Sequence, residues 1–326
     1  MRRREFITLV GGATAWPFTV RAQQPAMPVI GFLHSGSPDQ NVDRLATFHK
    51  GLDEAGFVEG HNVKIDFQWA SGQIDKLPGL AADLVRRHVA VIVTPFSTDA
   101  ALAAKAATTT IPIVFASSAD PIEIGLVPSL NHPGGNITGV ASLNTELAPK
   151  RLDLLRRLVP QATQYFALVN PTSNLAAPVQ RTLDVAASTL GIHLEILRAS
   201  NDNELEIAFA RIPQQYRSVL VSSTDPFFFT RRQQIATLAV RYAVPTIFDA
   251  PPYVEAGGLI SYGGDQADLM LLTTRYVSRV LKGERPENLP VVQSAKFTMA
   301  INLKTSKALG IVVPPDLLTI ANEVIE

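Results

Sequence analysis

Residues 29–56 read VIGFLHSGSPDQNVDRLATFHKGLDEAG, and this stretch decides the fold. Its first five residues form a near-continuous apolar run, which is typical of a strand buried on both faces of a parallel sheet. A polar loop follows, and then Leu45, Phe48 and Leu52 recur with the spacing of one helix face. Gly56 supplies a stop for that helix. The stretch therefore predicts one unit of strand, loop and helix.

The same unit repeats along the chain, which predicts an α/β protein with doubly wound parallel sheets. In the first series we expect strands at 63–69, 90–94 and 113–116, with helices at 77–87 and 100–108. In the second series we expect strands at 166–169, 193–197, 218–222 and 246–248, with helices at 177–190, 204–212 and 231–242. The two series match in order and spacing, which indicates an internal duplication and two lobes.

The end of the chain holds more elements than the second lobe needs: strands at 258–262 and 296–302, helices at 267–281 and 306–309, and a terminal segment at 318–325. We therefore expect a return to the first sheet near Glu255 and a crossing back between Pro290 and Lys296. Three crossings then form a hinge that allows closure around a ligand. The expected lobes are 28–141 with 254–292, and 142–253 with 293–326.

Residues 1–22 have the features of an export signal. The segment Arg3-Arg4-Glu5-Phe6-Ile7 resembles the twin-arginine pattern, and the apolar run after it is too short for a membrane anchor. Small residues flank Arg21 at the positions where a signal is usually cleaved. We expect a twin-arginine signal that is cleaved near Ala22 and a mature protein in the periplasm.

The composition excludes several classes of protein. Without residues 1–22 the chain keeps 25 basic and 28 acidic side chains, a formal charge of −3. No basic cluster remains to neutralise a phosphate backbone, so nucleic acid is not an expected partner. The absence of cysteine excludes disulfides, thiolate chemistry and a lipid on an N-terminal cysteine. After residue 22 no apolar run approaches the roughly 20 residues that a bilayer requires.

Catalytic and metal-binding motifs are not found in the sequence. The six histidines lack the HExxH or paired spacing of metal ligands, and the GxSxG, GxxxxGK[ST] and GxGxxG patterns are absent from the expected places. We therefore expect no catalytic residue, no metal and no cofactor. A hydrolase that uses Ser35 or Ser97 stays open, although the sequence places no base beside either.

The loops at the carboxyl ends of the parallel strands are the expected ligand site. They are rich in hydroxyl, amide and carboxyl groups and poor in basic ones, and Phe96 and Tyr262 add aromatic faces, which suits a small zwitterion with an apolar or aromatic body. The candidate ligand-binding residues are Ser35, Gly36, Phe96, Ser97, Thr98, Asp99, Ser117, Ser118, Asn170, Ser173, Asn174, Thr224, Asp225, Asp249 and Tyr262.

Two ligand groups have named candidates in these loops. Ser97 and Thr98 precede a predicted helix, where hydroxyl and N–H groups could hold a carboxylate, although capping of the helix explains them equally well. Asp225 or Asp249 could pair with an ammonium. Asp225 precedes a proline and fits an ordinary turn, so Asp249 is the stronger candidate.

Several longer phrases resemble the ABC transporter substrate-binding proteins of the type I periplasmic-binding fold, in the group of tryptophan and tyrosine receptors. They are spread over essentially the whole chain: 111–116 (IPIVFA), 119–121 (ADP), 125–127 (GLV), 133–139 (PGGNITG), 253–259 (YVEAGGL), 301–305 (INLKT) and 308–311 (ALGI). The resemblance implies uptake of an amino acid or related small molecule without chemistry on it, and docking on ABC permease subunits of the inner membrane. We expect a monomer.

The loop from Thr94 to Asp99 departs from the short Gly-Thr-Pro-like start of similar proteins, because Phe96 and Asp99 add an aromatic ring and an acid. The departure leaves the identity of the ligand open. Two other functions also stay open: an exported α/β hydrolase or isomerase acting in the same cleft, and a ligand sensor for a membrane signalling protein. Turnover of a bound ligand would distinguish the enzyme from both receptors.

Overall fold

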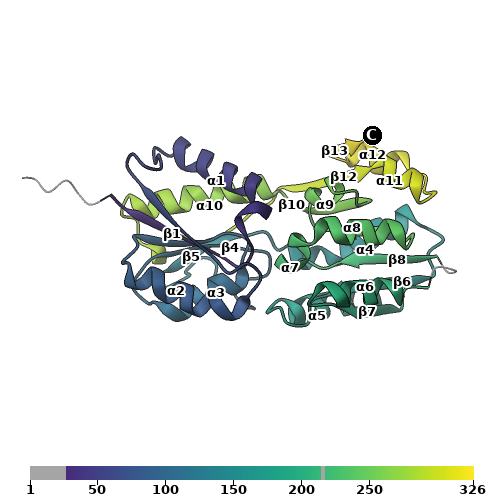
Figure 1. Cartoon of the computed structure of the whole chain (residues 1–326), viewed down its shortest axis with the longest axis horizontal. Coiled ribbons are helices and arrows are strands. Elements are labelled where there is room, and N and C mark those ends of the chain that lie inside the picture. The colour runs from purple at the N-terminus through teal and green to yellow at the C-terminus, as the bar shows by residue number, and fades with distance from the viewer. Residues whose placement is uncertain (1–26, 214–216) are drawn as a thin grey trace, which may run out of the picture.

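The computed structural model describes residues 27–213 and 217–326, which form two α/β lobes lying side by side (Figure 1). The first lobe is built on a six-stranded sheet of order β11-β5-β4-β3-β1-β2, and the second on a seven-stranded sheet of order β13-β12-β10-β9-β8-β6-β7. Among the paired strands, only β10 and β12 are antiparallel. The expected pair of doubly wound lobes is confirmed.

The first sheet is buried on both faces. Its strands are β1 (Val29–His34), β2 (Lys64–Trp69), β3 (Val91–Thr94), β4 (Ile113–Ser117), β5 (Ile137–Ala141) and β11 (Val292–Gln293). Helices α1 (Val42–Glu54) and α10 (Gln266–Leu281) pack together on one face, and α2 (Leu77–Arg86) and α3 (Thr98–Ala107) on the other. Within β1, Ile30 and Phe32 join the core under α1, while Leu33 joins the core under α2. This two-sided burial explains the unbroken apolar run that opens the sequence.

The second sheet repeats this arrangement. Its strands are β6 (Gln164–Val169), β7 (Leu194–Arg198), β8 (Ser218–Ser222), β9 (Thr246–Phe248), β10 (Ile260–Gly264), β12 (Phe297–Asn302) and β13 (Glu323–Ile325). Its helices are α4 (Ala148–Leu158), α5 (Ala176–Leu190), α6 (Asp202–Ala210), α7 (Pro226–Thr230), α8 (Arg232–Arg241), α9 (Pro251–Glu255), α11 (Leu303–Ala308) and α12 (Pro315–Ile320). Helix α4 was not expected. The short helices α7 and α9 were not expected either. Each begins with a proline, which is favourable in a first helical turn.

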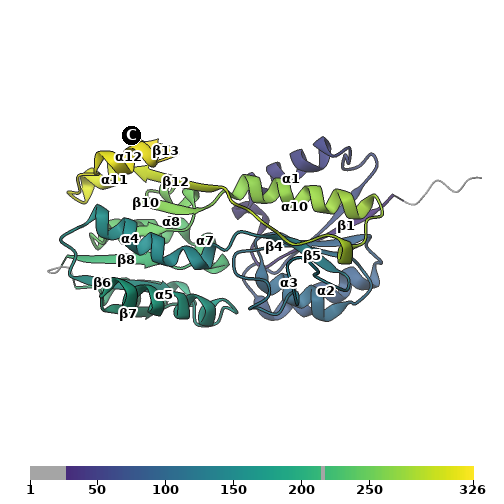
Figure 2. The same ribbon diagram turned by 180° about the vertical axis from the view of Figure 1, so that it is seen from behind.

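The strand β10 lies in a different sheet from the one expected. It pairs with β9 and β12 in the second sheet, so the predicted return near Glu255 is wrong. The chain crosses at Asp265, directly before α10 packs against α1. An apolar run predicts a buried strand but carries no information about the sheet edge that the strand joins. The three connections between the lobes lie near Ser142, Asp265 and Lys296 (Figure 2).

The expected signal segment, residues 1–22, lies outside the described residues. Among the helices that the structure describes, none combines the length and the apolar character needed to cross a bilayer. Export by a twin-arginine signal therefore stays a prediction from the sequence.

Candidate functional site

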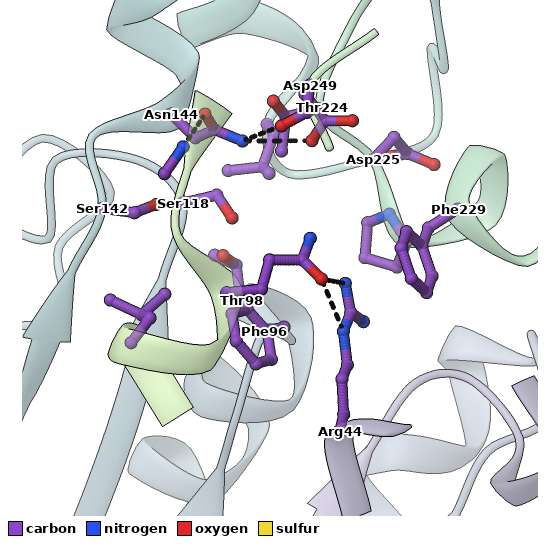
Figure 3. A pocket seen from close by; sticks show the side chains of 15 residues that line it. Arg44, Phe96, Thr98, Ser118, Ser142, Asn144, Thr224, Asp225, Phe229 and Asp249 are labelled. Carbon is purple, nitrogen blue, oxygen red and sulfur yellow. Dashed lines mark hydrogen bonds between the residues drawn. The ribbon is translucent and has the colours of Figure 1, made fainter. Parts of the chain in front are cut away.

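A cleft of about 520 Å³, including solvent at its mouth, lies between the lobes at the carboxyl ends of both sheets (Figure 3). The first lobe and α10 contribute Arg44, Phe96, Thr98, Ser118, Gln266 and Leu269. The second lobe contributes Leu175, Thr224, Asp225, Pro226, Phe229 and Asp249. The connections between the lobes contribute Ser142, Asn144 and Gly264.

Six of the residues expected at the ligand site line this cleft: Phe96, Thr98, Ser118, Thr224, Asp225 and Asp249. All six lie in the cleft for the same reason, since each follows the carboxyl end of a parallel strand. Phe96 also has a φ of 53°, a left-handed conformation that costs a bulky residue about 1–3 kcal/mol. The surrounding structure therefore holds this ring in place against a local preference.

Three of the expected serines use their hydroxyls inside the scaffold and do not line the cleft. The Ser97 hydroxyl donates to the Ser35 hydroxyl at 2.9 Å and accepts from the Ser35 N–H at 3.1 Å. The Ser117 hydroxyl donates to the Ala119 carbonyl at 3.0 Å. The bonds between Ser35 and Ser97 join the loops after β1 and β3, and the Ser117 bond stabilises the loop after β4 internally. The structure therefore assigns these three hydroxyls hydrogen bonds within the scaffold.

A second, smaller cavity of about 310 Å³ holds further expected residues, among them Ser35, Gly36, Asp99 and Asn170. It also lies between the lobes, and Asp225 borders both cavities. Ser173 lies at the edge of the second lobe, where its hydroxyl accepts from the Leu175 N–H at 3.2 Å.

Tyr262 is a correction to the expected site. It belongs to β10 and therefore to the second sheet, and its ring stacks on Phe297 with centroids 6.0 Å apart. It packs against the core of the second lobe and does not line the cleft. Tyr262 was expected in the cleft because its strand was assigned to the first lobe, whereas β10 belongs to the second.

The structure also brings in residues that the sequence argument missed, chiefly Arg44, Asn144, Phe229 and Gln266. Arg44 and Gln266 lie in the first turns of α1 and α10, just beyond the loops that were searched. The first turn of each helix faces the same sheet edge as the loop before it. The first helical turn after each strand-end loop therefore belongs to the expected site as well, and it includes both residues.

In the buried carboxylate of Asp249, one oxygen accepts a hydrogen bond from the described residues and the other does not. Its side chain is only 5% exposed, and Oδ2 accepts from Asn144 Nδ2 at 3.1 Å. Among residues 27–213 and 217–326, Oδ1 has no hydrogen-bond partner. Burial raises the pKa of Asp249, and the nearby charge of Arg151 opposes that rise. A buried carboxylate with a free oxygen in a cleft is suited to receive a cationic donor.

Asp225 is a helix cap as well as a lining residue. Its Oδ1 accepts from the N–H groups of Phe227 at 2.8 Å and Phe228 at 3.3 Å, and from Asn170 Nδ2 at 3.1 Å. Its position before a proline fitted an ordinary turn, and the structure shows that this turn opens α7, with Asp225 as the N-cap. Burial raises the pKa of Asp225 to about 6, against the stabilising hydrogen bonds.

The pKa of Asp225 predicts that protein stability falls as the pH rises. The pKa is about 6 in the folded state against 3.8 for the free side chain, so the folded chain binds more protons between these values and stability is lost from about pH 4 to pH 6. Asp225→Asn keeps an acceptor for α7 without the charge. We expect the unfolding free energy of the variant, relative to wild type, to rise by up to about 3 kcal/mol from pH 4 to pH 7. Urea titrations across this range measure it, and a constant difference contradicts the assignment.

A buried arginine, Arg151, forms hydrogen bonds to two of the connections between the lobes. Arg151 is only 1% exposed, and it donates to the Tyr262 carbonyl and to the carbonyl and side-chain oxygens of Asn144, each at 2.8 Å. Asn144 in turn accepts from Gly264 N and donates to Asp249. Two of the three connections between the lobes therefore meet at Asn144, and the same side chain orients Asp249.

The two lobes touch across the mouth of the cleft. Asn174 donates to Asp99, Gln40 donates to the Thr230 carbonyl at 3.3 Å, and Arg181 pairs with Glu123. Each pair joins one lobe to the other. The structure is therefore in a closed arrangement.

Comparison with known proteins agrees with this architecture. The sequence model of the ABC transporter substrate-binding protein family matches residues 28–325. A tyrosine-binding protein of Clostridioides difficile (strain R20291) is 29% identical over 263 residues, which are 80% of this chain and 75% of that protein.

Two solved structures are similar over 91% of this chain and 99% of their own length. An ABC domain of Streptococcus pneumoniae in complex with L-Trp has a TM-score of 0.83 at 27% identity. A ligand-free, open substrate-binding protein with adhesive properties from Clostridium difficile has a TM-score of 0.66 at 26% identity. At nearly equal identity, the ligand-bound protein superposes better, as expected for a closed chain.

Proposed function

Because this chain belongs to the family of ABC transporter substrate-binding proteins, we propose that it is a receptor that closes its lobes over one amino acid and delivers it to an importer. Proteins of this family bind solutes rather than catalyse reactions, in agreement with the expectation that the chain is not an enzyme. The observation that carries the amino-acid assignment is the unpaired Oδ1 of Asp249 in the cleft.

The ammonium of an amino acid is the natural partner of that oxygen. Asn144 holds the other oxygen of Asp249, so the carboxylate is oriented before a ligand binds. Thr224 lies beside it in the lining of the cleft, and its hydroxyl faces the same carboxylate, where it helps to lower the pKa of Asp249. A buried carboxylate and a hydroxyl together satisfy an ammonium, which has three hydrogens to donate.

We propose that the ligand is an amino acid with an aromatic side chain. Phe96, Phe229, Leu175 and Leu269 give the cleft apolar walls, and apolar walls with a few placed polar groups are typical of small-molecule sites. The similar proteins point the same way, since one is named for tyrosine and another was solved with L-Trp. Phe96 and Asp99, the two residues that distinguish this loop from that of similar proteins, lie in the cleft and in the neighbouring cavity, respectively. We propose that they determine which aromatic amino acid binds.

Substrate-binding proteins of ABC importers act outside the cytoplasmic membrane. The twin-arginine pattern at Arg3 and Arg4 supports export to the periplasm as a folded chain, with cleavage near Ala22. The partners would be the permease subunits in the inner membrane, approached by a monomer.

A thermal-shift screen of the chain without residues 1–22 tests the function. A ligand at 100 times its Kd adds about 2.7 kcal/mol to stability, which raises the melting temperature by about 5 °C or more. We expect tyrosine or tryptophan to give the largest shift among the amino acids, and the ligand to be recovered unchanged. Shifts only with other classes of solute would contradict the aromatic assignment, and turnover would contradict the receptor.

A further inference from the structure

Arg44 is the basic side chain in the lining of the cleft, and the expected function does not account for it. Its guanidinium carbon lies 4.5 Å from the centre of the Phe96 ring and 3.6 Å from that of Phe229. Figure 3 shows the side chain extending from α1 to a position between these two rings. Phe96 belongs to the first lobe and Phe229 to the second. The guanidinium therefore sits where the lobes meet.

The hydrogen bonds of Arg44 orient its charge without neutralising it. Nε and one terminal nitrogen donate to Gln266 Oε1 at 3.2 and 3.0 Å, and the other terminal nitrogen donates to Asn41 Oδ1 at 3.1 Å. Both acceptors are neutral amides, and the part of the chain that the structure describes offers this guanidinium no ion pair. Burial lowers the pKa of Arg44 to about 9, which still leaves it protonated at neutral pH. The charge of Asp249 across the cleft opposes this fall in pKa without a direct contact. A desolvated cation without an ion-pair partner is unfavourable, and an anionic ligand group would offset that cost.

The geometry of the remaining donors suits a carboxylate. A guanidinium has five N–H groups, of which three are used, so each terminal nitrogen keeps one. Two such donors on adjacent nitrogens can bind both oxygens of a carboxylate. Asp249 lies on the opposite side of the cleft from Arg44 (Figure 3). The site thus has an anionic and a cationic end.

The start of α3 is the competing anion site, and its chemistry is unfavourable. The Ser97 hydroxyl is already bonded to Ser35, so it is not free to donate to a ligand. Asp99 lies buried in the first turn of the same helix and accepts from Asn174. An acid in this position already interacts with the positive end of the helix dipole and repels a second anion.

We propose that Arg44 binds a carboxylate of the ligand, so that the cleft selects carboxylic acids and holds an amino acid between Arg44 and Asp249. The inference deepens the proposed function and rests on it. The carboxylate can be the α-carboxylate, which every amino acid has, or one on the side chain. Phe229 of the second lobe packs on the guanidinium of Arg44 from the first lobe. A carboxylate bound to Arg44 therefore lies at a contact that forms when the lobes close.

The test compares ligands with and without the carboxylate on wild-type chain and on Arg44→Gln. Calorimetry would give Kd values for tyrosine and tyramine, and for tryptophan and tryptamine. In the wild type we expect loss of the carboxylate to weaken binding by about 100-fold. In Arg44→Gln we expect the amino acids to lose most of that advantage, while the amines change far less. Arg44→Lys keeps the charge but not the planar fork, so it should be intermediate, and it replaces Arg44→Gln if that variant does not fold.

Further ligands separate the two sources of the carboxylate. If Arg44→Gln leaves the ratio of the Kd values for tyrosine and tyramine unchanged but removes binding of glutamate or aspartate, Arg44 binds a side-chain carboxylate. If acids without an ammonium bind in an Arg44-dependent way while amino acids do not, the proposed function fails and the role of Arg44 stands. An unchanged preference for every carboxylate in folded Arg44 variants overturns the proposal. Failure of the wild type to bind any carboxylic acid overturns it as well.

Discussion

Asp249→Asn is expected to weaken amino-acid binding by about 100- to 1,000-fold. Removing one partner of a buried, hydrogen-bonded charge pair costs about 2–5 kcal/mol, and each 1.4 kcal/mol is a factor of ten in affinity. The Asn side chain still offers an oxygen to Asn144, so the scaffold around the site is kept. What is lost is the charge that faces the ligand ammonium. Calorimetric titration with the ligand found in the screen measures the change.

Asp225→Asn is the matched control for this substitution. Both aspartates are buried and line the cleft, but the Asp225 oxygen caps α7, whereas Asp249 Oδ1 has no partner among the described residues. An Asn at a helix N-cap preserves that structural role. We expect the Asp225 variant to lose less than tenfold in affinity. Equal losses for the two variants would show that the ammonium is not bound specifically by Asp249.

Gly263→Ala is expected to destabilise the chain by about 3 kcal/mol and to disturb ligand binding at the same time. A Cβ at this position would lie 1.9 Å from the Asp249 carbonyl oxygen and 2.8 Å from Asn144 Oδ1. The first of these atoms is backbone, so no side-chain rotation relieves the clash. The backbone of Asp249 must move, and its carboxylate moves with it. Urea unfolding and calorimetry on the same preparation measure both effects.

Gly264→Ala is the neighbouring control, because its Cβ would lie 3.1 Å from the Ser142 Cβ and meet no backbone atom within 4 Å. We expect a stability loss of about 1 kcal/mol or less, since a small shift of the serine relieves the contact. A Gly263 variant no less stable than the Gly264 variant would mean that the close approach of β10 to Asp249 is not required.

Much of the fold was predictable because it depends on neighbours in the chain. The expected strands at 218–222 and 246–248 coincide with β8 and β9, and most other elements differ by one to three residues at their ends. Apolar runs and helical spacing are local signals, so they identify elements without knowledge of their partners. The position of Asp225 before a proline likewise indicated a turn, although not the helix α7 that it caps.

The assignment of the last elements was less accurate, for a physical reason. The strand near 260 has the same apolar character in either lobe, and only the pairing of β10 with β9 and β12 decides its sheet. Tyr262 was misplaced as a consequence. The helices α7 and α9 were missed because each has only five residues, too few to show a periodicity. Helix α4 was also missed, although its eleven residues place Leu152, Leu155 and Leu158 on a buried face.

The sequence by itself determined the order of strands and helices, the sheet edge at which a site would form, and the absence of cysteine chemistry. Only the tertiary structure decided which side chains meet there. Arg44 and Gln266 are 222 positions apart, and Asn144 and Asp249 are 105 apart. Such contacts depend on strand order and on where the chain crosses between lobes, and no local pattern encodes either. For the same reason, only the structure shows that the Asp225 oxygen caps a helix whereas an Asp249 oxygen has no hydrogen-bond partner among the described residues.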